Sequence, residues 1–200
     1  MTDFAVIDQR RYERCPACLA TLVAVEDLPS PEAELQHYLH HQNDIHDPSY
    51  RKFVSKLVEP LAKRLEAGAA GLDYGCGTGP VAATMLRERG FDVELFDPFF
   101  APDENVLERT YDFILCSEVV EHFHRPAEEF DKLGRLLRSG GTLAIMTCFQ
   151  VDDEDFAQWH YRRDPTHVAF YREDTFRHVA AQRGCKCEIP VKDVVLMQAS

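Results

Sequence analysis

The sequence predicts an α/β fold built around one mostly parallel β-sheet, with a small N-terminal extension. Two observations support this prediction. Strand-like and helix-like segments alternate from residue 70 to residue 184, and a glycine-rich loop, GCGTGP (75–80), joins the first such strand to a helix. Parallel strands need crossover connections, which helices usually supply. The 200 residues are enough for one sizeable core with a small appendage.

The first part of the chain is predicted to be a short extension followed by a helical cap. The extension, 1–30, carries the motif CPAC and ends at LPSP, which is typical of a linker. The cap or lid, 31–68, begins with a polar, helix-prone stretch, 31–44. An amphipathic helix over 48–68 follows, which Pro60 is expected to kink.

The later elements begin or end at recognisable signals. Gly90 ends the helix that follows the glycine loop, and Pro126 begins the next long helix. Runs rich in β-branched and aromatic residues indicate strands. The predicted strands span 70–74, 91–97, 111–117, 142–148, 185–190 and 192–198, and the predicted helices span 81–90, 126–141 and 172–184.

Composition narrows the class of partner. The formal net charge of −12 disfavours nucleic acid, because phosphate backbones require clustered Lys and Arg, but it suits a cationic small molecule or a divalent metal. No apolar run approaches the ~20 residues of a membrane helix, and the charged N-terminus is unlike a signal peptide. With seven cysteines, an odd number, we expect reduced thiols and a cytoplasmic protein without a membrane partner.

The glycine loop predicts a nucleoside-type cofactor. Gly75, Gly77 and Gly79 allow a tight turn and a close approach of the backbone to a ligand, at a helix N-terminus that favours anionic groups. Asp97 ends the next strand, where a carboxylate can accept hydrogen bonds from ribose hydroxyls. Pro80 takes the place of the last glycine of the dinucleotide pattern, which argues against an NAD(P) oxidoreductase. The alternative is an ordinary turn with a solvated Asp97.

Four motifs in order carry a family resemblance: LDYGCGTGP, LFDP, YDFILCSEVVEHF and GGTLAIMT. Together they resemble the class I S-adenosylmethionine-dependent methyltransferases, of the kind found in type 23 and type 12 methyltransferase domains. The resemblance covers about residues 48–198 and implies a methyltransferase domain over 31–200. It also implies a Rossmann-like sheet with an antiparallel last strand. Only 13 residues separate Asp97 from Tyr111, which predicts a shortened third-strand region.

The resemblance also implies where the cofactor lies. The glycine loop would line its methionine part, Asp97 would hold the ribose, and the start of the third motif would face the sulfonium. The adenine is expected on Phe99, Phe100 or the stretch 105–107. The residues implied to bind S-adenosylmethionine are Asp73, Tyr74, Gly75, Cys76, Gly77, Gly79, Asp97, Pro98, Cys116 and Ser117.

The stretch CSEVVEH suggests a metal site. On a helix, Glu118, Glu121 and His122 would share one face, and His167 could reach them from a later loop at the same edge of the sheet. Carboxylates with imidazoles suit Mg²⁺, Mn²⁺, Fe²⁺ or Co²⁺. The pattern is similar to that of small-RNA 3′-terminal 2′-O-methyltransferases and of ubiquinone-pathway O-methyltransferases, which implies a metal that clamps neighbouring hydroxyls.

A metal-free reading of the same residues stays open. The glutamates then begin a helix, and His122 or His167 is the general base near neutral pH. In either case we expect transfer to a small molecule, most readily at oxygen, with nitrogen and sulfur as alternatives. We also expect His167→Ala to lower turnover more than cofactor affinity. A cofactor-binding subunit without turnover is the rival from another class.

The loop 149–171 and the segment 38–50 are candidate covers for the site. In the loop, His160, Tyr161 and Arg163 could hold the substrate, and the alternative is a packed loop with exposed charges. In the segment, His41 and Tyr50 could close over the cofactor, or the histidines could simply face water.

Cys15 and Cys18 form half of a zinc ribbon. The second CxxC that a ribbon needs is absent from the sequence. His37, His40 and His41, or Cys185 and Cys187, could complete a zinc site; otherwise the motif is a purely structural knuckle. The sequence makes no prediction of the oligomeric state.

Overall fold

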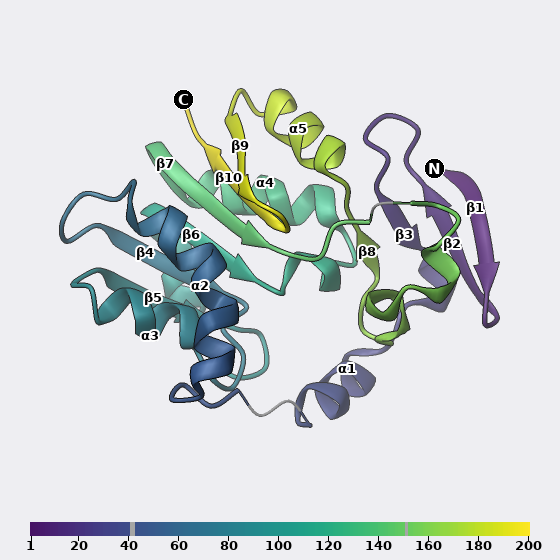
Figure 1. Ribbon diagram of the computed structural model, residues 1–200, viewed down its shortest axis with the longest axis horizontal. Coiled ribbons are helices and arrows are strands. Elements are labelled where there is room, and N and C mark those ends of the chain that lie inside the picture. Colours follow the sequence, from purple (N-terminus) through teal and green to yellow (C-terminus); the bar gives the residue numbers. More distant parts are fainter. Residues whose placement is uncertain (41–42, 151) are drawn as a thin grey trace.

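A computed structural model describes residues 1–40, 43–150 and 152–200, and within them a six-stranded sheet forms the centre (Figure 1). Its strand order is β5-β4-β6-β7-β10-β9. The first four of these strands are parallel, and β10 is antiparallel to both of its neighbours. The strands are β4 (Ala70–Tyr74), β5 (Asp92–Phe96), β6 (Tyr111–Ser117), β7 (Leu137–Met146), β9 (Lys186–Val191) and β10 (Val194–Gln198). This confirms the predicted α/β sheet with an antiparallel last strand.

Helices cover both faces of this sheet. On one face lie α2 (Pro48–Ala62) and α3 (Val81–Arg87), and on the other lie α4 (Pro126–Leu136) and α5 (Glu173–Gln182). Strand β6 shows the two-residue period: Phe113 and Leu115 pack in the core beneath α2 and α3, whereas Ile114 and Cys116 pack in the other core. The near-continuous apolar run of β6 follows from burial on both faces.

The connection between β5 and β6 contains only the short 3₁₀-helix η2 (Glu104–Glu108). The shortened third-strand region is therefore confirmed, and β5 is an edge strand.

Three predicted helices differ in the structure. The helix predicted over 48–68 ends at Ala62. The helix predicted over 126–141 ends at Leu136, and the residues after it already belong to β7. The stretch CSEVVEH is not an α-helix: it forms the 3₁₀-helix η3 (Val120–His122), and Glu118 precedes that helix with a left-handed φ of 54°. The helical spacing expected for Glu118 is thus wrong, because its backbone leaves the strand through a sharp turn instead.

The N-terminal extension forms a second sheet that the sequence analysis did not anticipate. Its order is β1-β2-β3-β8, and every pair is antiparallel. The strands are β1 (Thr2–Ile7), β2 (Arg10–Arg14), β3 (Thr21–Val23) and β8 (Ala169–Phe170). Because β8 comes from the late part of the chain, the boundary predicted at residue 30 separates segments that share one sheet. Buried Tyr12, Phe156 and Phe170 form its core.

Short helices link the two sheets. Helix α1 (Pro31–Tyr38) lies below the gap between them in Figure 1, with Ser30 as its N-cap. The remaining 3₁₀-helices are η1 (Val25–Asp27), η4 (Phe156–Gln158) and η5 (His160–Arg163). In the described ranges, every helix is too short or too polar to cross a bilayer.

Candidate active site

A cavity of about 760 Å³ opens at the carboxyl ends of β4, β5 and β6. That volume is in the range of roughly 300–1,000 Å³ that is typical of small-ligand sites. Helix α1, the start of α2, the glycine loop, the end of β5 and η3 contribute to its wall. The cavity therefore lies where ligands bind in open α/β sheets.

The glycine loop bounds one side of the cavity and tolerates no side chain at two positions. Gly75 has a φ of 81°, and a Cβ there would lie 2.6 Å from the Val119 side chain. At Gly79 a Cβ would lie 1.8 Å from the carbonyl oxygen of Asn43, so the segment before α2 crosses directly over the loop. The backbone of the loop is thus held close to whatever occupies the cavity.

Two carboxylates on this side of the cavity, those of Asp97 and Asp73, accept hydrogen bonds from main-chain N–H groups. The Oδ2 atom of Asp97 accepts the N–H of Gly77 at 3.0 Å, and its Oδ1 atom accepts N–H groups of Phe99 and Phe100 at 2.8 and 3.0 Å. These bonds fix the carboxylate at the end of β5. Burial raises the pKa of Asp73 to about 7, although the N–H of Ala83 partly offsets that effect.

Nearly all residues implied to bind the cofactor line the cavity: Asp73, Tyr74, Gly75, Cys76, Gly77, Gly79, Asp97, Pro98 and Ser117. Cys116 does not, because it alternates to the other face of β6 and its side chain is fully buried in the core. Phe99 and Phe100 line the cavity, whereas the stretch 105–107 is not part of its wall. Of the three positions expected for the adenine, only Phe99 and Phe100 therefore lie at the cavity.

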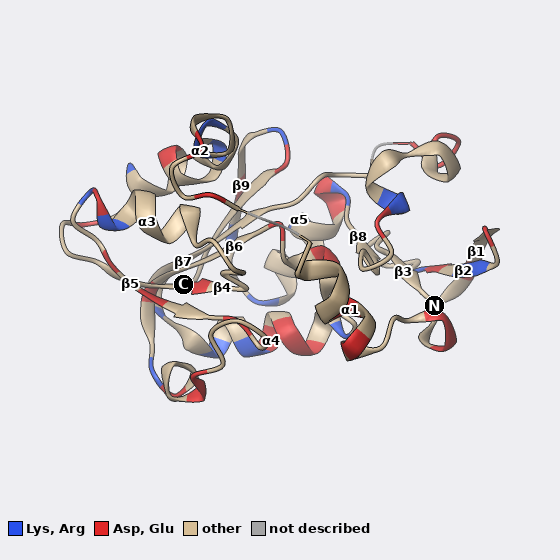
Figure 2. Cartoon of the chain, turned by 90° about the horizontal axis from the view of Figure 1, so that it is seen from below, with Lys and Arg blue, Asp and Glu red and all other residues tan. Residues whose placement is uncertain are grey.

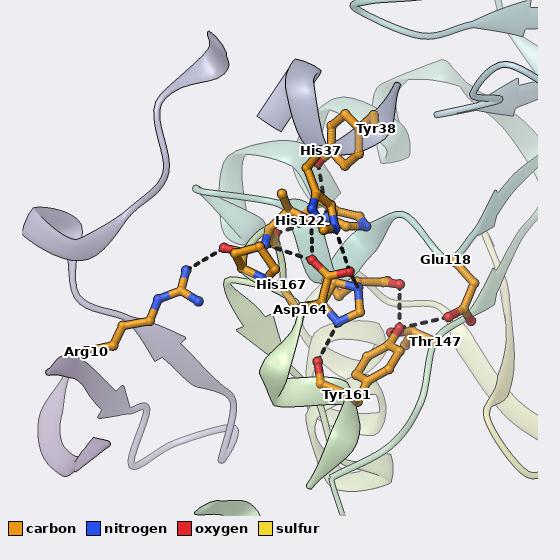
Figure 3. A network of polar contacts seen from close by, with 12 residues as sticks. Arg10, His37, Tyr38, Glu118, His122, Thr147, Tyr161, Asp164 and His167 are labelled. Carbon is orange, nitrogen blue, oxygen red and sulfur yellow. Dashed lines mark hydrogen bonds and ion pairs between the residues drawn. The ribbon is translucent and has the colours of Figure 1, made fainter. Parts of the chain in front are cut away.

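A cluster of ionisable side chains lies at the other end of the cavity (Figure 3). In the part of the chain that the structure describes, Glu121, His122 and His167 form the one group that could hold a metal ion, with donor atoms within 4.8 Å of one another. The two histidines line the cavity, and Glu121 is fully buried behind its wall. Glu118 lines the cavity but lies outside this group.

Main-chain carbonyls fix both imidazoles in the same tautomer. The Nδ1 atom of His122 lies 3.0 Å from the carbonyl oxygen of Thr166, and Nδ1 of His167 lies 2.7 Å from that of Tyr161. A carbonyl can only accept, so each Nδ1 carries a proton, and in the neutral form of each ring Nε2 has the lone pair. Burial, the main cause, lowers the pKa of His122. Both rings are therefore suited to accept a proton or a metal.

Tyr161 ties the two glutamates together. Its hydroxyl donates to Oε1 of Glu121 and lies 3.1 Å from both Oε2 of Glu118 and Oγ1 of Thr147. Burial, followed by the charge of Glu121, raises the pKa of Glu118 well above its ordinary value. One carboxyl group of the pair therefore keeps its proton, as expected for two close acids in a dry site.

The segment that carries His167 is held by a turn and by the N-terminal sheet. Oδ1 of Asp164 accepts the N–H of Thr166 at 2.8 Å, which forms an Asx-type turn, and Arg10 donates to the Pro165 carbonyl at 3.0 Å. Buried Arg162 donates to Asp8 at 2.9 Å. The sequence analysis missed these supporting residues; the Asp-Pro-Thr signal for the turn was available, but the partners from the extension were not.

Helix α1 covers the cluster through polar contacts. The hydroxyl of Tyr38 lies 3.1 Å from Nδ1 of His122, Nε2 of His37 lies 3.1 Å from Oδ2 of Asp164, and Nε2 of His124 lies 2.9 Å from Oε1 of Glu34. Figure 2 marks acidic residues in red along α1 and α4, and both helices contribute residues to the cavity wall. The predicted lid thus contacts the site directly, and Tyr50 also lines the cavity. His41 lies outside the described residues.

The three residues expected to bind the substrate differ in burial and in their distance from the cavity. Tyr161 is buried and serves the glutamate pair. His160 and Arg163 are exposed and lie outside the cavity wall, because η5 turns them to the surface, where Arg163 donates to Gln158 at 3.2 Å.

Cys15 and Cys18 lie in the turn between β2 and β3 as free, half-buried thiols. No third His, Cys, Asp or Glu among the described residues completes a metal group with them. His37, His40, Cys185 and Cys187 therefore do not complete a metal site with this pair, and His41 lies outside the described residues.

Comparison with solved structures supports the fold. The chain resembles an O-methyltransferase family protein from Burkholderia thailandensis, with 17% identity, a TM-score of 0.51, and coverage of 84% of this chain and 67% of that chain. It also resembles a protein from Galdieria sulphuraria assigned as a sarcosine dimethylglycine methyltransferase, with 18% identity, a TM-score of 0.54, and coverage of 78% and 74%. A protein from Bacillus halodurans C-125 assigned as a methyltransferase shows 22% identity, a TM-score of 0.55, and coverage of 68% and 67%.

Sequence comparison identifies the family. Curated protein sequences give no significant match. A family model described as a methyltransferase domain, type 23, matches residues 38–188, which is more than half of the chain and includes the glycine loop, Asp97 and the histidine cluster. The chain therefore belongs to this methyltransferase-domain family and is an S-adenosylmethionine-dependent methyltransferase.

Proposed function

We propose that this enzyme transfers a methyl group to a hydroxyl of a small-molecule acceptor with the help of a divalent cation held by Glu121, His122 and His167. The observation that carries the proposal is the second carboxylate oxygen of Glu121. This Oε2 atom is buried and has no hydrogen-bond partner, yet the side chain is fully enclosed beside two imidazoles. A buried carboxylate oxygen without a partner is costly unless a cation compensates it.

The donor set fits such a cation. Two imidazoles and one carboxylate suit Mn²⁺, Fe²⁺ or Co²⁺, and Mg²⁺ when oxygen ligands are added. The carbonyls of Thr166 and Tyr161 hold both Nδ1–H groups, which is the usual support of metal-ligating histidines. Glu118 remains a candidate fourth ligand, and to act as one it would have to exchange its contact with Tyr161.

The chain's own residues bind and orient the reactants. The glycine loop and Asp97 hold S-adenosylmethionine, whose sulfonium supplies an electrophilic methyl group. Phe99 and Phe100 offer an apolar surface for its adenine. The acceptor lies between the cofactor and the histidines and releases its hydroxyl proton to solvent water. Its oxygen then forms a bond to the methyl carbon as the sulfur–carbon bond breaks, which leaves S-adenosylhomocysteine. A cation held by the cluster would lower the pKa of that hydroxyl and orient it.

A second candidate is metal-free transfer to oxygen, nitrogen or sulfur with His122 or His167 as the base. The lowered pKa of His122 supports it, because a neutral imidazole at neutral pH can accept a proton. The two candidates share the same histidines and differ in the need for a cation.

Calorimetric titration of Mn²⁺ and Mg²⁺ into protein saturated with S-adenosylhomocysteine separates the candidates. The metal-assisted proposal expects saturable binding that Glu121→Ala abolishes. The matched control is Glu128→Ala, since Glu128 lines the cavity but is not a member of the cluster. If the unaltered protein binds neither ion, the metal-assisted proposal is wrong, and the metal-free candidate with a histidine as general base is retained.

Kinetics of His167→Ala test the histidine under either candidate. Turnover should fall by about 10²-fold or more, in the range assigned to a lost acid–base or positioning group, while cofactor affinity stays within about twofold. Exposed His160→Ala, seven residues earlier, is the control and should retain full turnover. Equal turnover in the two variants would remove His167 from the chemistry.

A further inference from the structure

Part of the cavity wall is formed by three linked side chains that belong neither to the glycine loop nor to the histidine cluster. Tyr74 lies at the end of β4, Glu129 and Lys132 lie on α4, and all three line the cavity. The Tyr74 hydroxyl donates to Oε2 of Glu129 at 2.6 Å and accepts from Nζ of Lys132 at 2.8 Å. Burial, followed by the hydrogen bond to Glu129, raises the pKa of Tyr74, so its hydroxyl keeps the proton that it donates.

Glu129 and Lys132 have polar atoms left for a ligand. Their side chains are 31% and 32% exposed, and Oε1 of Glu129 has no hydrogen bond to any residue that the structure describes. The Lys132 ammonium has three N–H donors, and one of them is used by Tyr74. A carboxylate only accepts and an ammonium only donates. A ligand that fits both side chains must therefore present a donor beside an acceptor.

This group lies beside the place expected for the ribose. Asp97 directly follows Phe96, whose ring stacks on the Tyr74 ring with centroids 5.1 Å apart. The Lys132 ammonium lies 5.4 Å from the Phe96 centroid. Within the described residues β5 is the edge strand of the large sheet, so no strand lies beyond Asp97. Polar groups for the part of the ligand next to the ribose therefore come from α4.

We propose that Glu129 and Lys132 recognise the edge of the adenine of S-adenosylmethionine. Glu129 accepts from the 6-amino group, and Lys132 donates to a neighbouring ring nitrogen. Adenine presents this pattern, an amino donor beside a ring-nitrogen acceptor. Tyr74 acts as a positioning residue, because its hydroxyl contacts both side chains. The proposal rests on the placement of the ribose at Asp97 in the proposed function, and it adds a selection of the base.

Equilibrium binding of two cofactor products tests the proposal. S-Adenosylhomocysteine carries the 6-amino group, whereas S-inosylhomocysteine carries an oxygen there and would place an acceptor against the Glu129 carboxylate. The unaltered protein should bind the inosine compound at least about tenfold more weakly. Equal affinities would overturn the recognition of the base, while the binding of S-adenosylhomocysteine would still support the cofactor site. The measurement needs neither metal nor acceptor, so it is independent of the metal-assisted proposal.

Glu129→Gln is the decisive variant. Glutamine keeps an oxygen that can accept from Tyr74, and it adds an amide donor for the inosine oxygen. The preference for the adenosine compound should therefore fall to about twofold or less. The matched control is Glu128→Gln, since Glu128 also lines the cavity from α4 but has no contact with Tyr74, and it should keep the full preference.

Lys132→Met tests the donor. Methionine keeps an apolar stem beside the Tyr74 and Phe96 rings, so the wall should remain packed. Affinity for S-adenosylhomocysteine should fall about tenfold. Far-ultraviolet circular dichroism reports whether each variant is folded. A folded Glu129→Gln protein that keeps the full preference, or a folded Lys132→Met protein with unaltered affinity, contradicts the proposal.

Discussion

The two ends of the cavity are built in different ways. The cofactor end comes from one continuous stretch, in which β4, the glycine loop, α3 and the end of β5 follow each other in sequence. The histidine end combines η3, the segment before β8 and α1, which are far apart in sequence, and it rests on the N-terminal sheet through Arg10 and Arg162. On the proposed function, cofactor binding therefore depends on one local stretch of sequence, whereas the placement of the histidines depends on tertiary contacts.

Apart from the loss of His167 itself, the largest expected effect is at the cofactor end. Gly75→Ala places a Cβ against Val119 at a φ of 81°, and the left-handed backbone alone costs about 1–2 kcal/mol for an alanine. Cofactor affinity should fall at least about tenfold, since about 1.4 kcal/mol corresponds to tenfold. Equilibrium binding of S-adenosylhomocysteine measures it.

Gly134→Ala is the matched control for this change. Gly134 lies in α4, where a Cβ would meet no atom within 4 Å. The substitution should leave affinity unchanged and raise the free energy of unfolding by about 0.5–1 kcal/mol, because alanine favours a helix interior. A wild-type affinity in Gly75→Ala would contradict the steric role of the glycine.

The second effect tests the tertiary support. Arg162→Met leaves the half-buried carbonyl of Ala157 and the buried hydroxyl of Tyr12 without their donor, which should lower the free energy of unfolding by about 1–3 kcal/mol. Turnover should fall about tenfold or more, because Arg162 holds the segment that positions His167. Cofactor affinity should not change. Exposed Arg163→Met is the control, and equal turnover in both variants would disconnect the N-terminal sheet from the chemistry.

A smaller effect is expected from the lid. Tyr38→Phe removes the hydroxyl that lies 3.1 Å from Nδ1 of His122, a contact worth about 0.5–1.5 kcal/mol. Turnover should fall by roughly two- to tenfold in steady-state assays. Tyr50→Phe, on the same cavity wall, should change it less. If Tyr50→Phe lowers turnover more than Tyr38→Phe does, then α2 rather than α1 positions His122.

The smallest effect is at the surface between the two sheets. Asp153 accepts from Arg14 at 2.6 Å and also pairs with Arg172; the hydrogen bond from Arg14, the main cause, lowers the pKa of Asp153. Its contribution to stability is present above the ordinary value of 3.8 and is lost as the pH falls below it. Asp153→Asn should lower the free energy of unfolding by less than about 1 kcal/mol at pH 7, and the difference should shrink as the pH falls below 3.8.

Thermal unfolding at several pH values follows this difference between Asp153→Asn and the unaltered protein. Neighbouring Asp152→Asn is the control and should show no such pH dependence. A difference that grows as the pH falls would contradict the assignment.

The same contrast explains what the sequence could predict. The β4–loop–α3 unit was predicted closely, because glycines, an apolar strand and an amphipathic helix are local signals. The helix expected at Glu118 was wrong, because a left-handed φ of 54° at a glutamate is imposed by surrounding structure. Strand β8 has two residues and exists only by pairing with β3, so no local pattern could show it. His167 is recognised by its residue type, but the Tyr161 carbonyl that supports it and the contacts from the N-terminal sheet are visible only in three dimensions.

The pairing of β3 with β8 has a consequence for synthesis on the ribosome. The hairpin of β1 and β2 emerges first, yet its sheet is complete only when residues 169–170 have left the exit tunnel. Until then β3 has an unpaired edge, which can pair wrongly with other nascent chains. The two histidines also come together only at this late step. A partly synthesised chain can therefore form the glycine loop before His167 has joined the site.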